Sequence, residues 1–253
     1  MAGEMAFLYG TPAGVAGSVS RPLDSEVESI ELGATPPTAY GVVLVAESGT
    51  GKFNAVANTN VQSDFKGFLV RSVPNISGGI DNTFSSGTPN ASYFQGRLTR
   101  GYLKAVCTQG TPVKSGAVYV RLVAATGKLV GDLEATADVT VAGGVITGTG
   151  TGTIAATVTA AAIQGTWSLK LQTTSQTSLV TVIDPNGLRH PDATVGTAYT
   201  SGGLTFTITA AGTMTAGDSF APVVTGNNVA MIGAEWAVNG KDGNNVSEIR
   251  YTI

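Results

Sequence analysis

The chain has 253 residues, of which 12% are charged, and its formal net charge at pH 7 is −3. Its 34 glycines separate short runs rich in Thr, Val and Ala, a composition typical of an all-β protein with tight turns and few helices. Positive residues are scattered singly and no stretch approaches the roughly 18 apolar residues of a membrane span, so the sequence excludes nucleic acid and membranes as expected partners.

The first 22 residues predict an extended N-terminal arm. The stretch AFLYGTPAGVAGSVSRPL consists mainly of small residues and prolines, as is typical of a segment that becomes ordered on binding. Within it, Phe7, Leu8 and Tyr9 are candidate apolar anchors on a partner, and Arg21 is a candidate polar anchor. The opening residues lack the basic start and long apolar run of a signal peptide, so we expect a soluble protein made in the cytoplasm.

The stretch RPLDSEVESIEL places three acids at alternate positions. Because side chains alternate between the two faces of a strand, Asp24, Glu26 and Glu28 are expected to line one face. Neighbouring carboxylates are compatible with acid–base catalysis or Ca²⁺ binding. Acids on a single strand more often solubilise an edge or meet a basic partner, so we favour a solvated or partner-facing role.

The stretch VVLVAESGTGKF, residues 42–53, approaches the layout of a phosphate-binding loop, in which glycines and a Lys hold the phosphates and a hydroxyl ligates Mg²⁺. Here Ala46 stands at the first glycine position and Phe53 at the hydroxyl position, and no helical pattern follows. Phe cannot ligate Mg²⁺. The stretch therefore predicts a glycine turn between two strands and no nucleotide cofactor.

Cys107 and His190 are the only residues of their kinds, which limits the chemistry of the chain. One cysteine can form neither an intrachain disulfide nor a thiolate metal cluster, and Cys107 lies in a strand-like run where a buried thiol is expected. A metal site of Asp184, His190 and Asp192 is an alternative, but a turn acid and a loop histidine explain these residues better. We predict no catalytic residue, cofactor or metal site, and no enzymatic activity.

Residues 143–225 differ from the rest of the chain in having few charges, and both ends of the block are flexible in composition. The repeat GTGTGT near its start predicts a linker or an edge strand. The stretch TWSLKLQT puts Trp167, Leu169 and Leu171 on one strand face, LTFTIT alternates apolar residues with threonines, and residues 184–187 (DPNG) predict a hairpin turn. We therefore predict a separate β domain.

The flanking segments also alternate as strands, in GFLVRSVP, GAVYVRLVAATG and VSEIRYTI. The last of these places Ile249, Tyr251 and Ile253 on one face, so the C-terminus is expected to pack into a sheet. Residues 226–253 then rejoin residues 1–142 in one domain, and residues 143–225 form an insertion that projects outward from it.

The flanking segments resemble the structural cement proteins of tailed bacteriophages, which decorate the outside of the head. The resemblance covers roughly residues 5–142 and 226–253 and rests on ordered stretches. These are GSVSRPLDSEVES, AYGVVLV, GFLVRSVP, RLTRGYLKAV, KSGAVYVRL and GAEWAVNGKDGNNVSEIRYTI.

This resemblance implies an all-β, jelly-roll or barrel-like domain that binds the major capsid protein on the outer surface of the virion. Each copy would cross-link neighbouring capsomers and stabilise the head, as part of a homo-oligomer that is a dimer or a trimer. The arm and the acids at 24, 26 and 28 are then candidate contacts with the capsid or with a neighbouring protomer.

The inserted block resembles, more loosely, the extra β domain of some phage head decoration proteins, and we expect a small β-sandwich-like fold. The alternative hypothesis is a carbohydrate-binding adhesin or tail-fibre module that uses the insert to bind a host-surface glycan. Sugar sites usually offer exposed aromatic platforms, and the insert has only Trp167, Tyr199, Phe206 and Phe220. Trp167 and Phe206 fall on predicted core faces, which favours the cement hypothesis.

Overall fold

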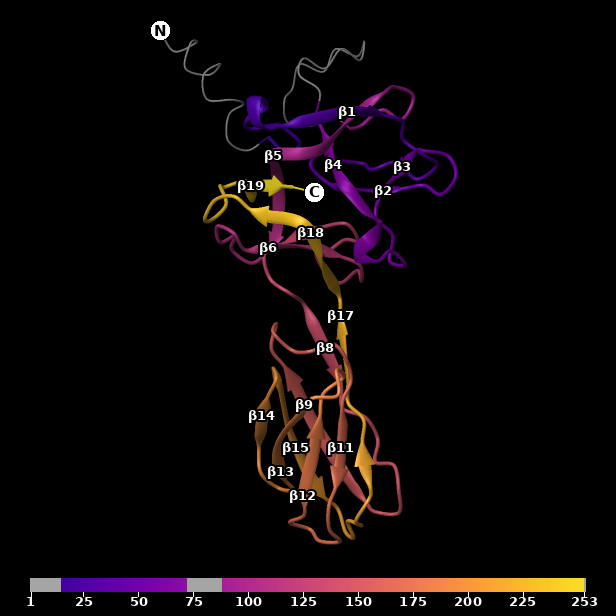
Figure 1. Cartoon of the computed structure of the whole chain (residues 1–253), viewed down its shortest axis with the longest axis vertical. Coiled ribbons are helices and arrows are strands. Elements are labelled where there is room, and N and C mark those ends of the chain that lie inside the picture. The colour runs from indigo at the N-terminus through magenta and orange to yellow at the C-terminus, as the bar shows by residue number, and fades with distance from the viewer. Residues whose placement is uncertain (1–14, 72–87, 253) are drawn as a thin grey trace. The chain divides into compact units, whose positions relative to one another are not determined.

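The structure is a computed structural model that describes residues 15–71 and 88–252, and it confirms the all-β prediction. Strands β1 to β19 dominate these residues, and the helical elements among them are two single-turn 3₁₀ helices, η1 (Pro22–Asp24) and η2 (Gln62–Asp64) (Figure 1). Within the same residues no helix has both the length and the apolar character needed to cross a membrane. The chain divides into two compact units: unit 1 comprises Met1–Thr136 and Asn228–Ile253, and unit 2 comprises Ala137–Asn227.

Unit 1 is built around a closed five-stranded barrel. In this barrel β5 pairs with β19, β19 with β18, β18 with β6, β6 with β7, and β7 with β5 again; only the β5–β7 pair is parallel. Closure removes the open sheet edges, so the barrel alternative of the predicted fold holds. The strands of unit 1 are β1 (Glu26–Ile30), β2 (Val43–Ala46), β3 (Phe53–Asn54), β4 (Phe65–Val70), β5 (Gln95–Gln109), β6 (Ala117–Arg121), β7 (Leu133–Glu134), β18 (Asn228–Trp236) and β19 (Val246–Tyr251).

Strand β5 belongs both to the barrel and to a sheet beside it. Its first half pairs with β1 and β4, and its second half pairs with β19 and β7. Gly101 lies between the halves at φ +124°, where a Cβ would overlap Ser25. A glycine is therefore required where the strand passes from one sheet to the other.

The core of unit 1 follows the alternation seen in the sequence. Leu103, Ala105 and Cys107 of β5 are fully buried, as are Ile249 and Tyr251 of β19, which confirms that the C-terminal strand packs into a sheet. Burial raises the pKa of the Cys107 thiol and raises that of Tyr251 to about 12. Cys107 is thus the buried thiol expected from the sequence, in a form unsuited to nucleophilic chemistry.

A buried ionic network joins three barrel strands at the end of unit 1 where the chain leaves for unit 2. Arg121 of β6 donates from Nε and Nη2 to the two carboxylate oxygens of Glu134 of β7, at 2.6 and 3.1 Å, and both side chains are 1% exposed. Asn228, the first residue of β18, donates from Nδ2 to Glu134 and to the carbonyl of Thr136. The bidentate geometry satisfies charges that would be very costly to bury alone.

The glycine-rich stretch at 42–53 is a hairpin, as predicted. β2 pairs antiparallel with β3, and Gly49 and Gly51 turn the chain at φ +79° and +72°. Lys52 forms an ion pair with Glu31 at 3.3 Å. The residues that follow are a strand and a short turn, which rules out the helix on which a phosphate-binding loop depends.

Unit 2 is a β-sandwich-like fold of three sheets, ordered β13-β12-β11-β16, β14-β15-β9 and β10-β17-β8. Leu169 and Leu171 from the first sheet and Phe206 and Ile208 from the second belong to one buried cluster, as their alternation predicts. The repeat GTGTGT ends in β9, which pairs only with β15 and so is an edge strand. The strands are β8 (Val139–Ala142), β9 (Gly152–Val158), β10 (Gly165–Thr166), β11 (Ser168–Leu171), β12 (Leu179–Ile183), β13 (Arg189–Thr194), β14 (Tyr199–Ser201), β15 (Leu204–Ala210), β16 (Ser219–Phe220) and β17 (Val223–Gly226).

Unit 2 extends a few residues beyond the block 143–225 at both ends. The reason is the antiparallel pair of β8 and β17, in which Val139 is opposite Gly226 and Ala142 is opposite Val223. These two strands are the first and last of the unit (Figure 1). The charge pattern alone does not mark them, because neither strand carries a charge.

Removing one partner of the buried ion pair should be far more harmful than removing both. Glu134→Ala leaves the Arg121 charge buried without its partner, and we expect a loss of about 3–5 kcal/mol in the free energy of unfolding of unit 1. The double variant Arg121→Met with Glu134→Leu should recover most of that loss. Trp236 lies in unit 1 and Trp167 in unit 2, so urea unfolding followed by Trp236 fluorescence in a Trp167→Phe background measures unit 1 alone. Equal losses in the single and double variants would contradict this account.

Candidate functional site

The last residues of the predicted arm are part of the sheet. The N–H of Gly17 donates to the carbonyl of Lys104 at 2.7 Å, the N–H of Lys104 donates to Ser18, and Val19 bridges Leu103 of β5. The arm is therefore fixed to β5 from residue 17 onward. Phe7, Leu8 and Tyr9, the predicted apolar anchors, lie outside the described residues.

Arg21 is held by two groups and presents a fixed charge. Its guanidinium lies 3.9 Å from the centre of the Tyr102 ring, and its Nη2 is 2.9 Å from Oε2 of Glu248. The hydrogen bond that Arg21 donates to Glu248 raises the pKa of Arg21 above its usual value. The side chain remains 45% exposed, so Arg21 is available to a partner while its position is set by β5 and β19.

The prediction that three carboxylates line one strand is wrong for Asp24. Asp24 lies in η1, because Pro22 starts a 3₁₀ turn and the strand begins only at Glu26. A register shift between Glu26 and Val27 sets Glu26 opposite Arg100 and Val27 opposite Leu98. Glu28 pairs with Arg97 at 2.6 Å, and Glu26 lies 3.7 Å from Arg100, both arginines of β5. These pairings make the acids a neutralised surface, in contrast to a free negative stripe.

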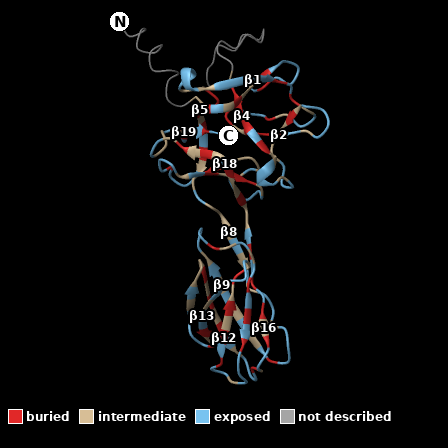
Figure 2. Cartoon of the chain, in the orientation of Figure 1, coloured by how far each residue is buried: buried red, intermediate tan, exposed pale blue. Residues whose placement is uncertain are grey.

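Exposed apolar side chains accompany these charges, and the sequence analysis missed them. Leu23 of η1 is fully exposed, Val27 of β1 is about half exposed, and Phe94, just before β5, is 71% exposed. Figure 2 shows the exposure of β1 over most of its length. The signal in the sequence is the pair Tyr93-Phe94 in a polar stretch, since adjacent aromatics ahead of a strand rarely share one core. We call this exposed edge of unit 1 the contact face; it consists of Arg21, Leu23, Asp24, Glu26, Val27, Glu28 and Phe94. Val27 projects from the opposite side of β1 to Glu26 and Glu28.

A shallow cleft of about 320 Å³ adjoins the contact face. Glu28, Ser29 and Phe94 line one part of it, and Gly51 and Lys52 of the β2–β3 turn line another. The structure thus brings the glycine-rich turn beside the acidic strand. The cleft combines paired charges with one exposed ring, a chemistry that suits a protein surface better than a small anionic ligand.

One cluster in unit 2 has the residue types of a hydrolytic triad. His190 Nδ1 lies 2.8 Å from Oγ of Ser201, and His190 Nε2 lies 3.3 Å from Oδ2 of Asp184. His190 belongs to β13 and stacks on Trp167 at 5.3 Å, so the expectation of a loop histidine is wrong. Asp184 accepts the backbone N–H groups of Asn186 and Leu188, as the predicted turn acid should. This arrangement fastens the 184–187 turn to the sandwich.

No metal site is found in the part of the chain that the structure describes, and the four large rings of unit 2 form no exposed platform. No group of three or more His, Cys, Asp or Glu side chains in that part is placed to hold a metal ion. In unit 2, Trp167, Phe206 and Phe220 are at most 2% exposed, and Tyr199 stacks on Phe206 and donates to the carbonyl of Pro191. These four rings therefore serve the core of unit 2.

A protein-family model, described as the XM1 gp53 minor capsid protein, matches residues 5–166, more than half of the chain. This chain belongs to the XM1 gp53 minor capsid protein family. As a minor capsid protein it is a structural component of a phage virion. Neither a curated protein nor a solved structure matches the chain.

The family match includes the arm from residue 5 onward, the contact face and three of the five barrel strands, whereas β18 and β19 lie beyond its end. It also continues into unit 2 as far as Thr166, past β8 and β9. The resemblance to cement proteins covers only segments outside residues 143–225, so the match to the minor capsid protein family reaches further along the chain before its end at residue 166. The first strands of unit 2 are therefore part of the family pattern.

The Asp184 turn predicts an acid-dependent stability of unit 2. Burial acts to raise the pKa of Asp184, but the hydrogen bonds from Leu188, His190 and Asn186 outweigh it and hold the pKa below its usual value. A carboxyl with a depressed folded-state pKa stabilises above its unfolded-state value, near pH 4, and loses that contribution as the pH falls through the folded-state value.

We therefore expect Asp184→Asn to lower the stability of unit 2 at pH 7 and to lose that effect progressively from about pH 4 downward. Urea unfolding followed by Trp167 fluorescence in a Trp236→Phe background measures it. Unit 1, followed by Trp236 in the Trp167→Phe background, is the internal control and should not respond. A difference between Asp184→Asn and its parent that stays constant down to pH 2 would refute the linkage.

Proposed function

We propose that this minor capsid protein binds the outer surface of the assembled phage capsid and cross-links neighbouring capsomers. The observation that carries the proposal is the contact face. Leu23, Val27 and Phe94 are apolar groups exposed to solvent in or near the edge strand β1, and Arg21, Glu26 and Glu28 near them are already paired within unit 1. Exposed apolar groups surrounded by polar ones are typical of protein–protein interfaces.

The stabilising mechanism follows from mass action. A protein that binds the assembled shell and not its separated subunits stabilises the shell by RT ln(1 + [L]/Kd) at each site. A copy that spans two capsid subunits also adds a contact that must break before the shell opens. This mechanism needs neither catalysis nor a cofactor, in agreement with the buried thiol and the structural role of His190.

Copies of the protein would act together on the lattice. A homo-oligomer, a dimer or a trimer, matches the symmetry axes of a shell, and several weak contacts then give a tight attachment. Phe7, Leu8 and Tyr9 of the arm are proposed as additional contacts with the capsid or with a neighbouring protomer. The major capsid protein is the proposed partner, and the outside of the virion the proposed location.

The glycan-binding alternative has no support from the rings of unit 2, because Trp167, Phe206 and Phe220 are buried. A sugar site that relied on stacking would need at least one of them at the surface. Binding to undecorated expanded capsids, tested beside binding to host-surface glycans, separates the two hypotheses.

Removing the apolar groups of the contact face should weaken capsid binding. We expect Leu23→Ser with Phe94→Ser to raise the dissociation constant from undecorated expanded capsids at least about tenfold, since exposed apolar anchors dominate such interfaces. Co-sedimentation at increasing protein concentration measures the change. Both residues are exposed, so the fold should be unaffected.

The matched control changes two other exposed apolar residues of unit 1, Val61→Ser with Ile232→Ser. Those variants should bind as the parent does. A deletion of residues 1–14 in the same experiment measures the share of the arm; it stops before Val15 because residues 17–20 pair with β5. Equal binding by the contact-face variant and its control would sink the proposal for this surface.

Unit 2 is proposed to project from the capsid-bound unit 1 and to be dispensable for binding. Ala142 and Val223 are directly opposite each other in the β8–β17 pair, so a two-residue Asn-Gly turn can replace residues 143–222. Val141 and Val224 lose their core in this variant and are changed to Thr.

We expect the shortened protein to remain folded, as reported by Trp236 fluorescence, and to co-sediment with capsids as the full chain does. The reason is that both strands of the junction keep their pairing and the barrel keeps all its own strands. Unfolding of the shortened protein, or a folded protein that no longer binds, would show that unit 2 belongs to the core or to the interface.

A further inference from the structure

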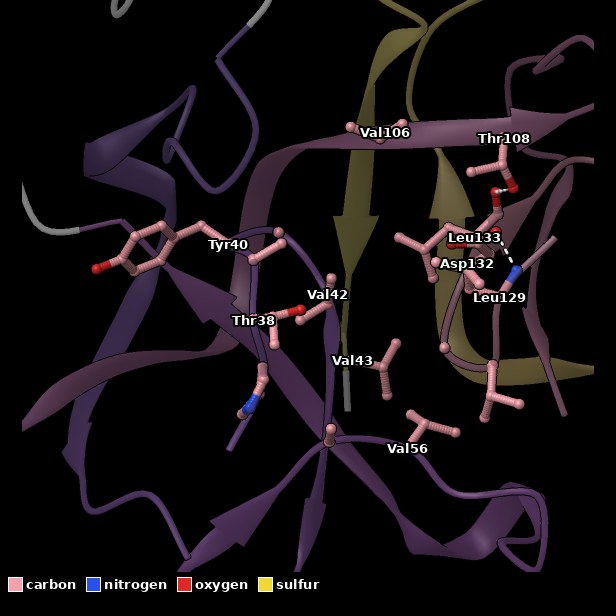
Figure 3. Close-up of a pocket in the computed structure, with 16 residues that line it drawn as sticks. Thr38, Tyr40, Val42, Val43, Val56, Val106, Thr108, Leu129, Asp132 and Leu133 are labelled. Carbon is pink, nitrogen blue, oxygen red and sulfur yellow. Dashed lines mark hydrogen bonds between the residues drawn. The ribbon is translucent and has the colours of Figure 1, made fainter. Parts of the chain in front are cut away.

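Unit 1 contains a pocket of about 300 Å³ away from the contact face. It lies between the segment that leads into β2, the second half of β5 and the loop before β7 (Figure 3). Val42, Val43 and Val56 lie on one side, and Leu129 and Leu133 on the other. Such a pocket has the size of a binding site for one or two side chains.

The lining of this pocket is almost entirely uncharged. Of the 16 lining residues, Asp132 alone carries a charge, and its carboxylate accepts the backbone N–H of Leu129 at 2.8 Å. Val106 at the rim is 38% exposed and Leu129 is 70% exposed. A hollow with an apolar rim of this kind is unfavourable in water unless something apolar covers it.

The first residues that the structure describes lie beside this pocket. Gly17 packs against Tyr40 and Gly41, two lining residues, so closely that a Cβ on Gly17 would overlap the Cβ of Tyr40. A Cβ on Gly41 would in turn meet the backbone nitrogen of Gly17 at 2.8 Å and the Cβ of Ala16 at 3.4 Å. The N–H of Arg71 donates to the carbonyl of Gly17 and secures this point. The arm therefore leaves unit 1 at the edge of the pocket.

We infer that the pocket is the binding site of the Phe7-Leu8-Tyr9 segment of the same chain. Five residues lie between Tyr9 and Val15. In extended form the chain from Tyr9 to Val15 reaches about 20 Å, enough to cross the pocket from its rim. Residues 5–14, MAFLYGTPAG, carry no charge and include the largest apolar side chains of the arm. Their chemistry matches an uncharged pocket whose rim is apolar.

Attachment to the same chain decides the occupant in dilute solution. A short tether gives the segment an effective concentration in the millimolar range, which a separate copy or another ligand has to exceed. On a crowded capsid surface a neighbouring copy can compete, and the same segment is then available for exchange. The inference concerns the free protein and does not depend on the proposed capsid binding.

Paired cysteines test, in the full chain, whether the segment around Leu8 binds in the pocket. Thr38 is an exposed lining residue, so Leu8→Cys with Thr38→Cys should form an intramolecular disulfide under mild oxidation at least about tenfold faster than a control pair. The control is Leu8→Cys with Val113→Cys, since Val113 is exposed and lies outside the pocket lining. Cys107 is buried and stays in place in both proteins. Non-reducing electrophoresis distinguishes a faster-migrating monomer from a cross-linked dimer.

A second measurement uses an apolar fluorescent dye. Deleting residues 1–14 should uncover the pocket and raise dye fluorescence several-fold. In the shortened protein, Val106→Trp at the rim should remove that gain. The matched control, Val113→Trp, should leave the gain unchanged. A monomer cross-link together with this dye response supports the inference. Cross-linked dimers in place of monomers would assign the pocket to a second copy. Equal cross-linking of both cysteine pairs, or equal dye binding with and without the arm, would contradict binding of the arm in this pocket.

Discussion

The constraint on which the barrel of unit 1 depends is that the two charges buried in it, those of Arg121 and Glu134, stay paired with each other. Arg121 and Glu134 come from β6 and β7, and Asn228 adds the first residue of β18 to the same network. An ionised group is costly to bury, so the loss of either charged side chain alone leaves the other charge buried and uncompensated. The chain leaves unit 1 just after Thr136 and returns at Asn228. Because Asn228 donates to the carbonyl of Thr136, the same network holds these two segments of unit 1 together.

Strand β5 connects the barrel to the contact face. Its second half pairs with β19 and β7 in the closed barrel, while its first half pairs with β1 and supplies Arg97 and Arg100 to the acids of that strand. Arg21 is likewise held between Tyr102 and Glu248. A contact face whose charges are positioned before binding loses little side-chain entropy on binding, which suits a protein proposed to lock a shell.

Unit 2 keeps its aromatic rings for its own core and fixes its main hairpin turn with the Asp184 and His190 pair. Its residue types resemble those of a hydrolytic site, but Asp184 is engaged by two turn amides and His190 is stacked on a buried tryptophan. The match to the minor capsid protein family continues as far as Thr166, so this unit begins within the family pattern. Its sheets complete a single buried cluster of their own.

Much of the fold could be predicted from the sequence, because strand alternation is a local property. The alternation of Trp167, Leu169 and Leu171, the burial of Ile249 and Tyr251, the thiol of Cys107 and the turn at 184–187 all depend on neighbours within a few residues. Ala46 and Phe53 stand where a phosphate-binding loop has a glycine and a hydroxyl. Their identity argues against that loop and favours a glycine turn between two strands, which is the β2–β3 hairpin.

The tertiary structure alone decided which side chains meet across strands. Nothing local pairs Arg121 with Glu134, or Glu28 with Arg97, since strand register and barrel closure bring them together. The turn at Pro22 removed Asp24 from the predicted acidic strand, and the path of the chain before β5 left Phe94 in solvent. Alternation along a strand shows which way a side chain points, but its partner is set by the neighbouring strand, which lies elsewhere in the sequence.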